Sequence, residues 1–334
     1  QYDQLYRLTN ADNATVQDEA YTYDAVGNRL TSANVTGNWN YNPNNELVNY
    51  DGVTYEYDDS GNMISKTDQS GTTTYIYDID NRLIQVRNPQ SEIYNYYYDP
   101  FGRRLWKNVG GNRTYFFYAD EGLIGEYDTN GVEIKTYGYA SNSTWTTNPL
   151  FQKIGTNYYW YQNDHLGTPQ KIIDTSGRIV WSATYESFGN IQITVAEIEN
   201  NLRFPGQYYD AETGLHYNYF RYYNPEIGSY ISEDPIGLVG GDVNLMTYVG
   251  NNPINLKDPL GLEVDVPFPG CIEKIPCRLV RPFYCESKFG SSCRASCQKY
   301  LGTDKWQTCL NTCNANLFGC NASSGCPYEG LPMN

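Results

Sequence analysis

The chain has 334 residues, long enough for two domains and a sizeable core. Its net charge of −15 is uneven: seven Lys/Arg and six Asp/Glu give residues 263–334 a charge of +1, which leaves −16 on residues 1–262. An acidic surface repels nucleic acid and anionic membranes, so neither is expected as a ligand of the large part. No apolar run reaches the roughly 18 residues that a membrane-spanning helix needs.

Tyrosine dominates the aromatic residues, with 34 Tyr against 11 Phe and 6 Trp. A core built on tyrosine favours β structure, in which rings pair across strands and the hydroxyl stays in water. The chain opens on Gln1 without an initiator Met or a signal-peptide pattern, and its first residues already belong to a repeat. We therefore expect a fragment of a longer protein.

A repeat with a spacing of roughly 20 residues runs through the first part of the chain. Each unit reads Tyr-x-Tyr-Asp, then a turn with Gly or Asn, then Arg or Asn followed by Leu. The clearest copies are YDQLYRL (Tyr2–Leu8), YTYDAVGNRL (Tyr21–Leu30), YEYDDSGNMI (Tyr55–Ile64), YIYDIDNRLI (Tyr75–Ile84) and YYYDPFGRRL (Tyr96–Leu105), with decayed copies at WNYNPNNELV (Trp39–Val48) and YFFYADEGLI (Tyr115–Ile124).

Each unit predicts a β-hairpin. The alternation of polar and aromatic residues places Tyr21 and Tyr23 on one face of a strand. Asp24 starts the turn, and Gly27 or Asn28 supplies the positive φ that most residues resist. A single hairpin cannot bury its aromatic face, so we expect the units to join into one long antiparallel sheet that winds on itself.

The units resemble the YD repeats of Rhs (rearrangement hotspot) proteins. The resemblance continues through HLGTPQKIIDTSGRIVWSATYESFGN (His165–Asn190). It is most specific in LRFPGQYYDAETGLHYNYFRYYNPEIGSYISEDPIGL (Leu202–Leu238) and VNLMTYVGNNPINLKDPLGL (Val243–Leu262). These stretches are similar to the Rhs repeat-associated core domain of Rhs polymorphic toxins and of the C subunits of Tc toxin complexes. The resemblance covers residues 1–262.

The resemblance implies a mainly β fold, in which a spirally wound antiparallel YD-repeat sheet forms a hollow shell around a variable C-terminal segment, often a toxin. We therefore expect a YD-repeat β shell at residues 1–164, a self-cleaving Rhs repeat-associated core at 165–262 and a cysteine-rich variable domain at 263–334. Because residues 1–262 are few for a complete enclosure, a partial shell is expected. Helical periodicity is nearly absent before residue 190, and only Thr194–Asn201 is expected to form a short helix.

Two copies of one motif, DPIGL at Asp234–Leu238 and DPLGL at Asp258–Leu262, stand just before the composition changes. By residue type alone, Asp-Pro-x-Gly is a type I turn. Two carboxylates held together can also hydrolyse a peptide bond, because they cannot both ionise: one activates water while the other donates a proton to the carbonyl. A bond tethered nearby needs no binding affinity, since attachment supplies a high effective concentration.

Similarity to the core domain assigns the catalytic pair to Asp234 and Asp258 and the bond that is cut to Leu262–Glu263. The reaction would be an intramolecular, single-turnover aspartic autoproteolysis without a cofactor or metal. If Asp234 and Asp258 serve only as turns, the chain stays intact.

Arg221, in FRYYNPEIG, matches a basic residue that accompanies the aspartates in the family motif. A guanidinium near the aspartates would keep one carboxylate ionised or stabilise the oxyanion. The alternative is a strand arginine stacked on Tyr222 or Tyr219. The two histidines, His165 and His216, lack an accompanying nucleophile motif, so we expect them in turns or packing.

All nine cysteines lie in residues 263–334, a density typical of disulfide scaffolds. The stretch CRASCQKYLGTDKWQTCLNTC holds two Cys-x-x-x-Cys pairs, and residues four apart share one face of a helix. Two such helices folded antiparallel place Cys293 opposite Cys313 and Cys297 opposite Cys309. We therefore predict a disulfide-stapled helical hairpin at residues 292–316.

Zinc is the competing interpretation, because four thiolates can bind it tetrahedrally, but the tail has no His and lacks the usual tight Cys turns. The spacing resembles that of disulfide-stapled helical hairpins in small intermembrane-space chaperones and plant hairpin peptides, which argues for a shape and not a role. Disulfides imply an extracytoplasmic destination. Five cysteines remain, so one thiol is unpaired or bonded to another molecule: Cys271, Cys277, Cys285, Cys320 and Cys326.

Together these features predict a secreted or cell-surface polymorphic toxin-like protein that cleaves itself after Leu262 and releases an effector-like tail. Its expected partners are its own tail as enclosed cargo and a neutralising immunity protein. The tail lacks His and shows no acid/base constellation, so no enzyme activity is predicted for it. The competing hypothesis is a non-cleaving cell-surface structural or adhesion protein that binds carbohydrate or a receptor, with the tail as a recognition module. A third hypothesis, that the tail is an enzyme of unknown type, would require activity from the isolated peptide of residues 263–334.

Overall fold

A computed structural model describes residues 1–13, 17–32, 35 and 39–262. The predicted cysteine hairpin, with Cys293, Cys297, Cys309 and Cys313, lies outside these residues, as does Glu263. Within the described part of the chain the fold is mainly β with antiparallel sheets, as the repeats predict. Among the described residues there is no helical segment with the length and apolar composition that a membrane span requires.

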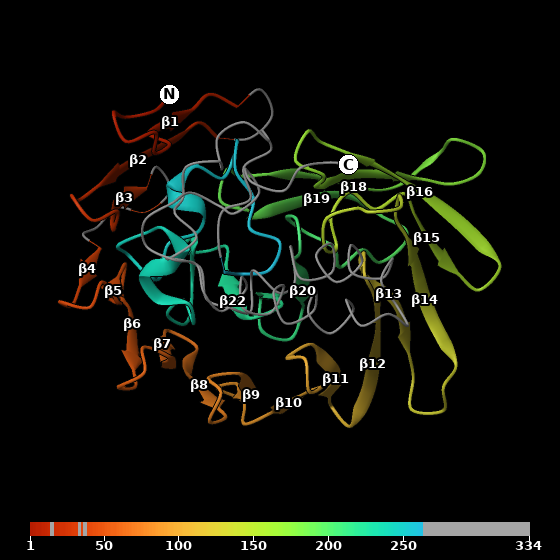
Figure 1. The fold of residues 1–334 in the computed structure, drawn as a ribbon, viewed down its shortest axis with the longest axis horizontal. Coiled ribbons are helices and arrows are strands. Elements are labelled where there is room, and N and C mark those ends of the chain that lie inside the picture. The colour runs from red at the N-terminus through yellow and green to blue at the C-terminus, as the bar shows by residue number, and fades with distance from the viewer. Residues whose placement is uncertain (14–16, 33–34, 36–38, 263–334) are drawn as a thin grey trace, which may run out of the picture. The chain divides into compact units, whose positions relative to one another are not determined.

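One sheet of sixteen strands dominates the described residues. Its strands are β4 (Asn40–Tyr41), β5 (Leu47–Tyr50), β6 (Val53–Tyr57), β7 (Met63–Asp68), β8 (Gly71–Tyr77), β9 (Leu83–Arg87), β10 (Ile93–Tyr98), β11 (Arg104–Val109), β12 (Asn112–Ala119), β13 (Gly122–Tyr127), β14 (Glu133–Gly138), β15 (Phe151–Ile154), β16 (Asn157–Asn163), β17 (Pro169–Ile173), β18 (Ile179–Tyr185) and β19 (Ile191–Ala196). Each strand pairs with the next in chain order, so the sheet is a continuous meander, which follows an arc in Figure 1.

Two smaller sheets accompany the large one. The first holds β1 (Asn10–Ala11), β2 (Glu19–Tyr23) and β3 (Arg29–Ser32), and the second holds β20 (Tyr208–Asp210), β21 (Leu215–Asn218), β22 (Arg221–Asn224) and β23 (Ser229–Tyr230). The second sheet lies on the inner side of the arc in Figure 1. After it come two short 3₁₀ helices, η1 (Gly237–Gly240) and η2 (Val249–Asn251).

The prediction of a short helix at Thr194–Asn201 is wrong. Its first residues belong to β19, which pairs antiparallel with β18. Ile193, Thr194 and Val195 are β-branched and favour a strand, and the ladder pairs Ile193 and Val195 with residues of β18. Tertiary pairing therefore overrides a short helical pattern at this position.

The repeats have a shared turn that explains their sequence. In the copy at Asp58, Oδ1 accepts the backbone N–H groups of Ser60 and Asn62, each at 2.9 Å. Oδ2 accepts the Asn62 side-chain amide at 3.0 Å, and Gly61 holds a φ of 72°. The same set of contacts, with Arg or Asn four residues on, recurs at Asp3, Asp24, Asp78, Asp99 and Asp174.

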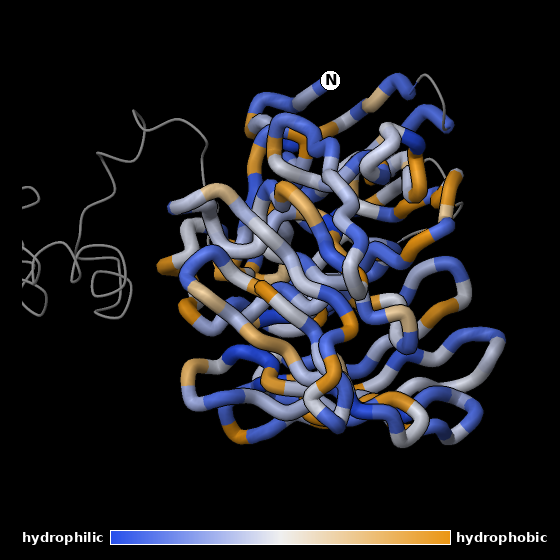
Figure 2. The backbone as a smooth tube through the Cα atoms, turned by 90° about the vertical axis from the view of Figure 1, so that its right-hand side faces the viewer, coloured by the Kyte–Doolittle hydropathy of each residue, from blue (hydrophilic) through white to orange (hydrophobic). Residues whose placement is uncertain are grey.

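Tyrosine rings of the repeats face the core. In β2, Tyr21 is buried while Thr22 is exposed, as strand alternation predicts. Figure 2 shows that short apolar stretches are separated by polar ones along the backbone. The expectation that the hydroxyls stay in water is not met at several positions: Tyr98 donates to the Leu83 carbonyl at 2.6 Å, and Tyr118 donates to the Arg104 carbonyl at 2.9 Å. Each of these hydroxyls ties one hairpin to the one before it.

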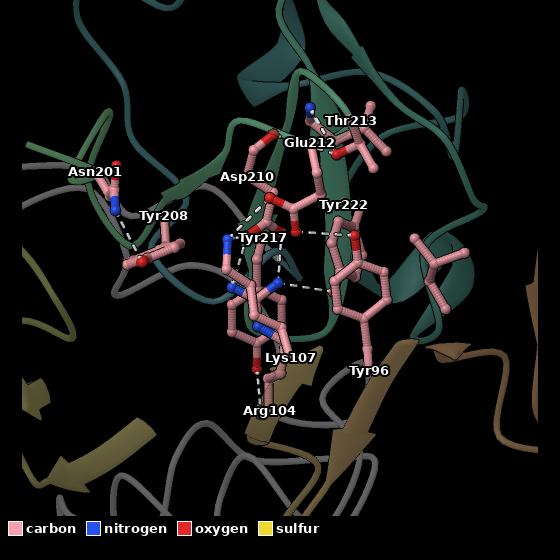
Figure 3. Close-up of polar contacts among 12 residues, drawn as sticks. Tyr96, Arg104, Lys107, Asn201, Tyr208, Asp210, Glu212, Thr213, Tyr217 and Tyr222 are labelled. Atoms are coloured by element: carbon pink, nitrogen blue, oxygen red, sulfur yellow. Dashed lines mark hydrogen bonds and ion pairs between the residues drawn. The ribbon is translucent and has the colours of Figure 1, made fainter. Parts of the chain in front are cut away.

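A buried ion pair joins the four-stranded sheet to the large sheet. Arg104 of β11 forms a bidentate pair with Asp210 of β20, and Lys107 lies 3.0 Å from Asp210 and 2.9 Å from Glu212 (Figure 3). Burial alone raises the pKa of Asp210, but Arg104 and Lys107 outweigh it and lower that pKa. The Arg104 guanidinium also lies among aromatic rings, the closest being Tyr217 at 4.5 Å.

Candidate functional site

The two Asp-Pro-x-Gly motifs fold into turns like those of the shell repeats. Asp234 Oδ1 accepts a backbone N–H two residues further on at 2.9 Å, and Asp258 Oδ1 accepts the N–H of Leu262 at 3.0 Å. Gly237 and Gly261 supply the positive φ, at 59° and 69°. Both motifs therefore form turns, and each turn fixes the direction of its carboxylate.

Arg221 connects the two turns. It lies on β22 and is 4% exposed, and its Nη2 lies 3.2 Å from Asp234 Oδ2 and 3.3 Å from Asp258 Oδ2. Its Nε donates to the Gly261 carbonyl at 2.6 Å, and its Nη1 donates to the Leu245 carbonyl at 3.0 Å. The structure thus brings both predicted aspartates to one guanidinium, that of Arg221.

Arginine stacking is present as well, but on a different ring from the two that were expected. The Arg221 Cζ lies 3.6 Å from the ring centroid of Tyr230. Tyr222 points to the opposite face of β22, where its hydroxyl contacts Tyr98 and Arg104. Because the stack and the ion pairs occur together, the two interpretations of Arg221 are compatible.

Asp258 has an unusual electrostatic setting. It is 3% exposed, and this burial raises the pKa of its carboxyl. Arg221, the Tyr230 hydroxyl and the N–H groups of Gly261 and Leu262 oppose that rise without cancelling it. Burial therefore favours the protonated form of Asp258 beside a second carboxyl group, that of Asp234.

The Leu262 carbonyl reaches the same space. A Cβ atom added to Gly240 would lie 2.8 Å from Asp234 Oδ2 and 2.9 Å from the Leu262 carbonyl oxygen, so both oxygens border one narrow gap. A cavity lined by Arg221, Asp234, Gly240, Asp258 and Leu262, among others, offers about 30 Å³ to the centre of a water molecule. That space is enough to hold water.

Sequence reasoning missed three residues of this site. Tyr230 donates its hydroxyl to Asp258 Oδ2 at 2.8 Å, Asn218 donates to the Asp258 backbone carbonyl at 2.9 Å, and Gly240 borders the gap. Asn218 could have been found if the hairpin register were known, because it pairs directly with Arg221. Gly240 had no comparable signal, since its role depends on two atoms from distant segments.

The two histidines lie elsewhere. His216 is buried between Tyr209 and Tyr223, and its Nδ1 lies 2.7 Å from Gln207 Oε1. Burial lowers the pKa of His216, so it is neutral at physiological pH. His165 contacts the Ile254 carbonyl through Nε2 at 2.8 Å. Within the described ranges, no group of three or more His, Cys, Asp or Glu side chains is placed to hold a metal ion.

Comparison with known proteins adds to this description. The Teneurin YD-shell family model matches residues 1–254. The chain belongs to the Rhs/YD-repeat family. This membership agrees with the resemblance found in the repeats and accounts for the meandering sheet.

Curated relatives of this Rhs/YD-repeat chain include proteins named as toxins and nucleases. The "Double-stranded DNA deaminase toxin A" of Burkholderia cenocepacia is 30% identical over 298 residues, which cover 78% of this chain and 20% of the relative. The "tRNA3(Ser)-specific nuclease WapA" of Bacillus spizizenii is 33% identical over 275 residues, covering 78% of this chain and 11% of the relative. The chain thus spans a fifth or less of these relatives. The crystal structure of TcdB2-TccC3-Cdc42 matches at 19% identity and a TM-score of 0.49, over 78% of this chain and 17% of that one.

Proposed function

We propose that this Rhs/YD-repeat chain cuts its own backbone between Leu262 and Glu263. Residues 165–262 would be the self-cleaving core, and residues 1–164 the shell that supports it. The observation that carries the proposal is the position of Arg221, whose Nη2 lies 3.2 Å from Asp234 and 3.3 Å from Asp258, next to the Leu262 backbone. A turn alone does not require two copies to meet at one guanidinium.

The two carboxyl groups have different roles in this mechanism. Asp258 acts as the acid, because burial raises the pKa of its carboxyl group and favours the protonated form. Asp234 acts as the base, and its Oδ2 lies 3.2 Å from Arg221 Nη2. The cavity between them is large enough for the attacking water. This division corresponds to the arrangement that two neighbouring carboxyl groups adopt in general acid–base catalysis.

The reaction is a hydrolysis in two steps. Water attacks the Leu262 carbonyl carbon while Asp234 takes a proton from the water and Asp258 gives one to the carbonyl oxygen, which forms a tetrahedral diol. The carbon–nitrogen bond then breaks: the Glu263 nitrogen takes the proton from Asp234, and Asp258 takes back the proton of the diol. The products are the Leu262 carboxyl group and a new amino terminus at Glu263.

The cut needs no affinity for its substrate. The backbone N–H of Leu262 donates to Asp258 Oδ1 at 3.0 Å, and in this mechanism that contact positions the Leu262–Glu263 bond next to the aspartates. Holding reactants in place in this way is worth on the order of 10⁵ M or more in effective concentration. We infer a single turnover for each chain.

The released segment, residues 263–334, would be an effector-like tail, stapled by disulfides at Cys293, Cys297, Cys309 and Cys313. The family's toxins and nucleases support a toxin-like role for the whole protein. Under this proposal the protein is secreted or exposed at the cell surface, the shell holds the tail as cargo, and an immunity protein protects the producing cell.

A non-cleaving adhesion protein is the second candidate, and one observation favours it. Phe151, Tyr158 and Trp160 form an aromatic cluster on β15 and β16, with Tyr158 41% and Trp160 44% exposed. Exposed aromatic rings of this kind can stack on sugars. Under this hypothesis the chain remains intact and the cluster binds carbohydrate.

The proposal is tested by synthesising the full chain in vitro with a carboxyl-terminal tag and separating the products on a denaturing gel. We expect the unaltered chain to give a tagged fragment whose first residue is Glu263 by amino-terminal sequencing. Asp234→Asn and Asp258→Asn should leave the chain whole, because each removes one of the two proton-transfer groups. Asp174→Asn, in an exposed repeat turn, is the matched control and should cut normally.

Two outcomes overturn the proposal. One is an identical band pattern for Asp258→Asn, Asp258→Ala and the unaltered chain. The other is a fragment that begins at a residue other than Glu263.

A further inference from the structure

Asn218 is a fully buried residue beside the aspartate pair. It ends β21, pairs with Arg221 across the hairpin and has no exposed surface. Its Nδ2 donates to two acceptors, the Tyr230 hydroxyl and the Asp258 backbone carbonyl, each at 2.9 Å. Both acceptors connect to Asp258, which suggests that the side chain is there to hold that residue.

Tyr230 relays this contact to the carboxylate. A phenol has one proton, and because Asn218 donates to the oxygen of Tyr230, the proton of Tyr230 is directed to Asp258 Oδ2 at 2.8 Å. Burial raises the pKa of Tyr230 well above its usual value, so the hydroxyl remains a donor. Asp258 is thus held at both ends, at its backbone carbonyl and at its carboxylate.

The amide oxygen of Asn218 also indicates that this side chain is present to hold Asp258. Among the described residues, Asn218 Oδ1 is buried without a hydrogen-bond partner. A buried acceptor without a partner is costly and uncommon in folded proteins. An apolar side chain would avoid that cost, so the two donations from Nδ2 are what makes asparagine useful here.

We propose that Asn218 is a positioning residue for self-cleavage, which acts through Tyr230 and the Asp258 carbonyl to fix the orientation of the Asp258 carboxyl group. The inference rests on the proposed self-cleavage and adds to it. Asn218 does not touch the Leu262 carbonyl in this role; it sets the direction in which Asp258 presents its proton.

Several groups determine how Asp258 titrates. Arg221 and the Tyr230 hydroxyl contact its carboxylate directly, and the Tyr248 hydroxyl faces its backbone. Asp234 shares the Arg221 guanidinium, and Asp242 lines the same cavity. The Tyr230 hydroxyl lowers the pKa of Asp258, so removing it raises that pKa further. If Asp258 must be protonated, cleavage by Tyr230→Phe should persist to higher pH than in the unaltered chain.

The test measures the cleavage rate of the full chain after a short pulse of in vitro synthesis. The newly synthesised chain is diluted into reducing buffers from about pH 4 to about pH 8, and the cleaved fraction is measured over time. Asn218→Ala should slow cleavage on the order of 10²-fold, the cost of misplacing a reacting group by about 1 Å. Tyr230→Phe keeps the shape of the ring, so it should cut within about 10-fold of the normal rate, with its alkaline limit moved upward.

Asn201→Ala is the matched control. Asn201 is also buried and donates to a tyrosine hydroxyl, that of Tyr208 at 2.9 Å (Figure 3). Its other side-chain donation goes to Glu199 Oε1 at 2.7 Å and not to either aspartate. Its substitution should leave the cleavage rate and its pH profile unchanged. Thermal denaturation of each variant shows whether a slow rate reflects loss of the fold.

The outcomes separate the inference from the proposed function. If Asp258→Asn is inert while Asn218→Ala cuts at the normal rate, the positioning role is wrong and self-cleavage stands. An unchanged pH profile for Tyr230→Phe also overturns the positioning role, even if Asn218→Ala does not fold. If Asp258→Asn cuts normally, the proposed function itself fails.

Discussion

Gly240→Ala is the sharpest probe of the space between the aspartate and the bond that it would cut. Gly240 ends η1 and does not occupy the left-handed region, so its backbone accepts alanine. The new methyl group would lie 2.8 Å from Asp234 Oδ2 and 2.9 Å from the Leu262 carbonyl oxygen. Ordinary contacts of this kind begin at 3.4 Å, so each oxygen must retreat by about 0.5 Å.

The size of the effect follows from this displacement. If Asp234 Oδ2 and the Leu262 carbonyl oxygen each move away by about 0.5 Å, the distance between them grows by about 1 Å. A displacement of this size slows the reaction on the order of 10²-fold. The strain of the added methyl group costs about 1–3 kcal/mol of stability, which leaves a chain of this size folded. We therefore expect a folded protein that is cut slowly.

Gly241→Ala provides the matched control. Gly241 has a φ of 92°, so alanine is strained there by about 1–2 kcal/mol, but its methyl group would meet no atom within 4 Å. In the pulse-synthesis assay Gly241→Ala should cut at the normal rate and Gly240→Ala about 10²-fold more slowly. A normal rate for Gly240→Ala would refute the idea that the gap between Asp234 and Leu262 is where the reaction occurs.

Four further predictions concern stability and pH. Arg104→Met leaves Asp210 buried with one cation fewer and should lower the free energy of unfolding by about 3–5 kcal/mol in a denaturant titration. Arg178→Met, at an exposed ion pair, is the control and should leave the unfolding transition nearly unchanged. The pKa of Asp210 is lower in the folded chain than in the unfolded chain, so its ionised carboxylate stabilises the fold above the unfolded pKa of about 3.9. This stabilisation is lost as the pH falls through the folded pKa, so the free energy of unfolding should decrease in acid. Arg104→Met should make that decrease smaller. Asp58→Ala should cost about 1 kcal/mol and Asp58→Asn less, because an amide oxygen can still accept both backbone N–H groups; equal losses would contradict the turn. Cleavage should continue above about pH 4, where an ordinary aspartate is ionised, and fall only as Asp258 loses its proton.

Much of the shell could be predicted from the sequence because its contacts are local. The Asp58 turn closes between residues two and four positions apart, and strand alternation alone separates Tyr21 from Thr22. Asn42, in a decayed copy, accepts the backbone N–H groups of Asn44 and Glu46 in the same way, so even that copy keeps the turn. The short helix predicted near Thr194 failed because pairing with β18, a tertiary contact, decided its conformation.

The candidate site was predictable only as a set of residue types. The paired motifs point to Asp234 and Asp258, and the family resemblance adds Arg221. The sequence by itself does not indicate that the three meet at one nitrogen, or that Asn218 and Gly240 border them, since these contacts join four segments of the chain.

The sequence by itself determined the hairpins, their turns and the acidic motifs, because each depends on interactions within a few residues. Only the tertiary structure decided that the Asp258 carboxyl group is buried, and this burial raises its pKa. Burial is a property of the packed sheets around Asp258 and not of its neighbours along the chain. The same holds for the tyrosine hydroxyls, whose acceptors lie on adjacent hairpins and become available only when the sheet has formed.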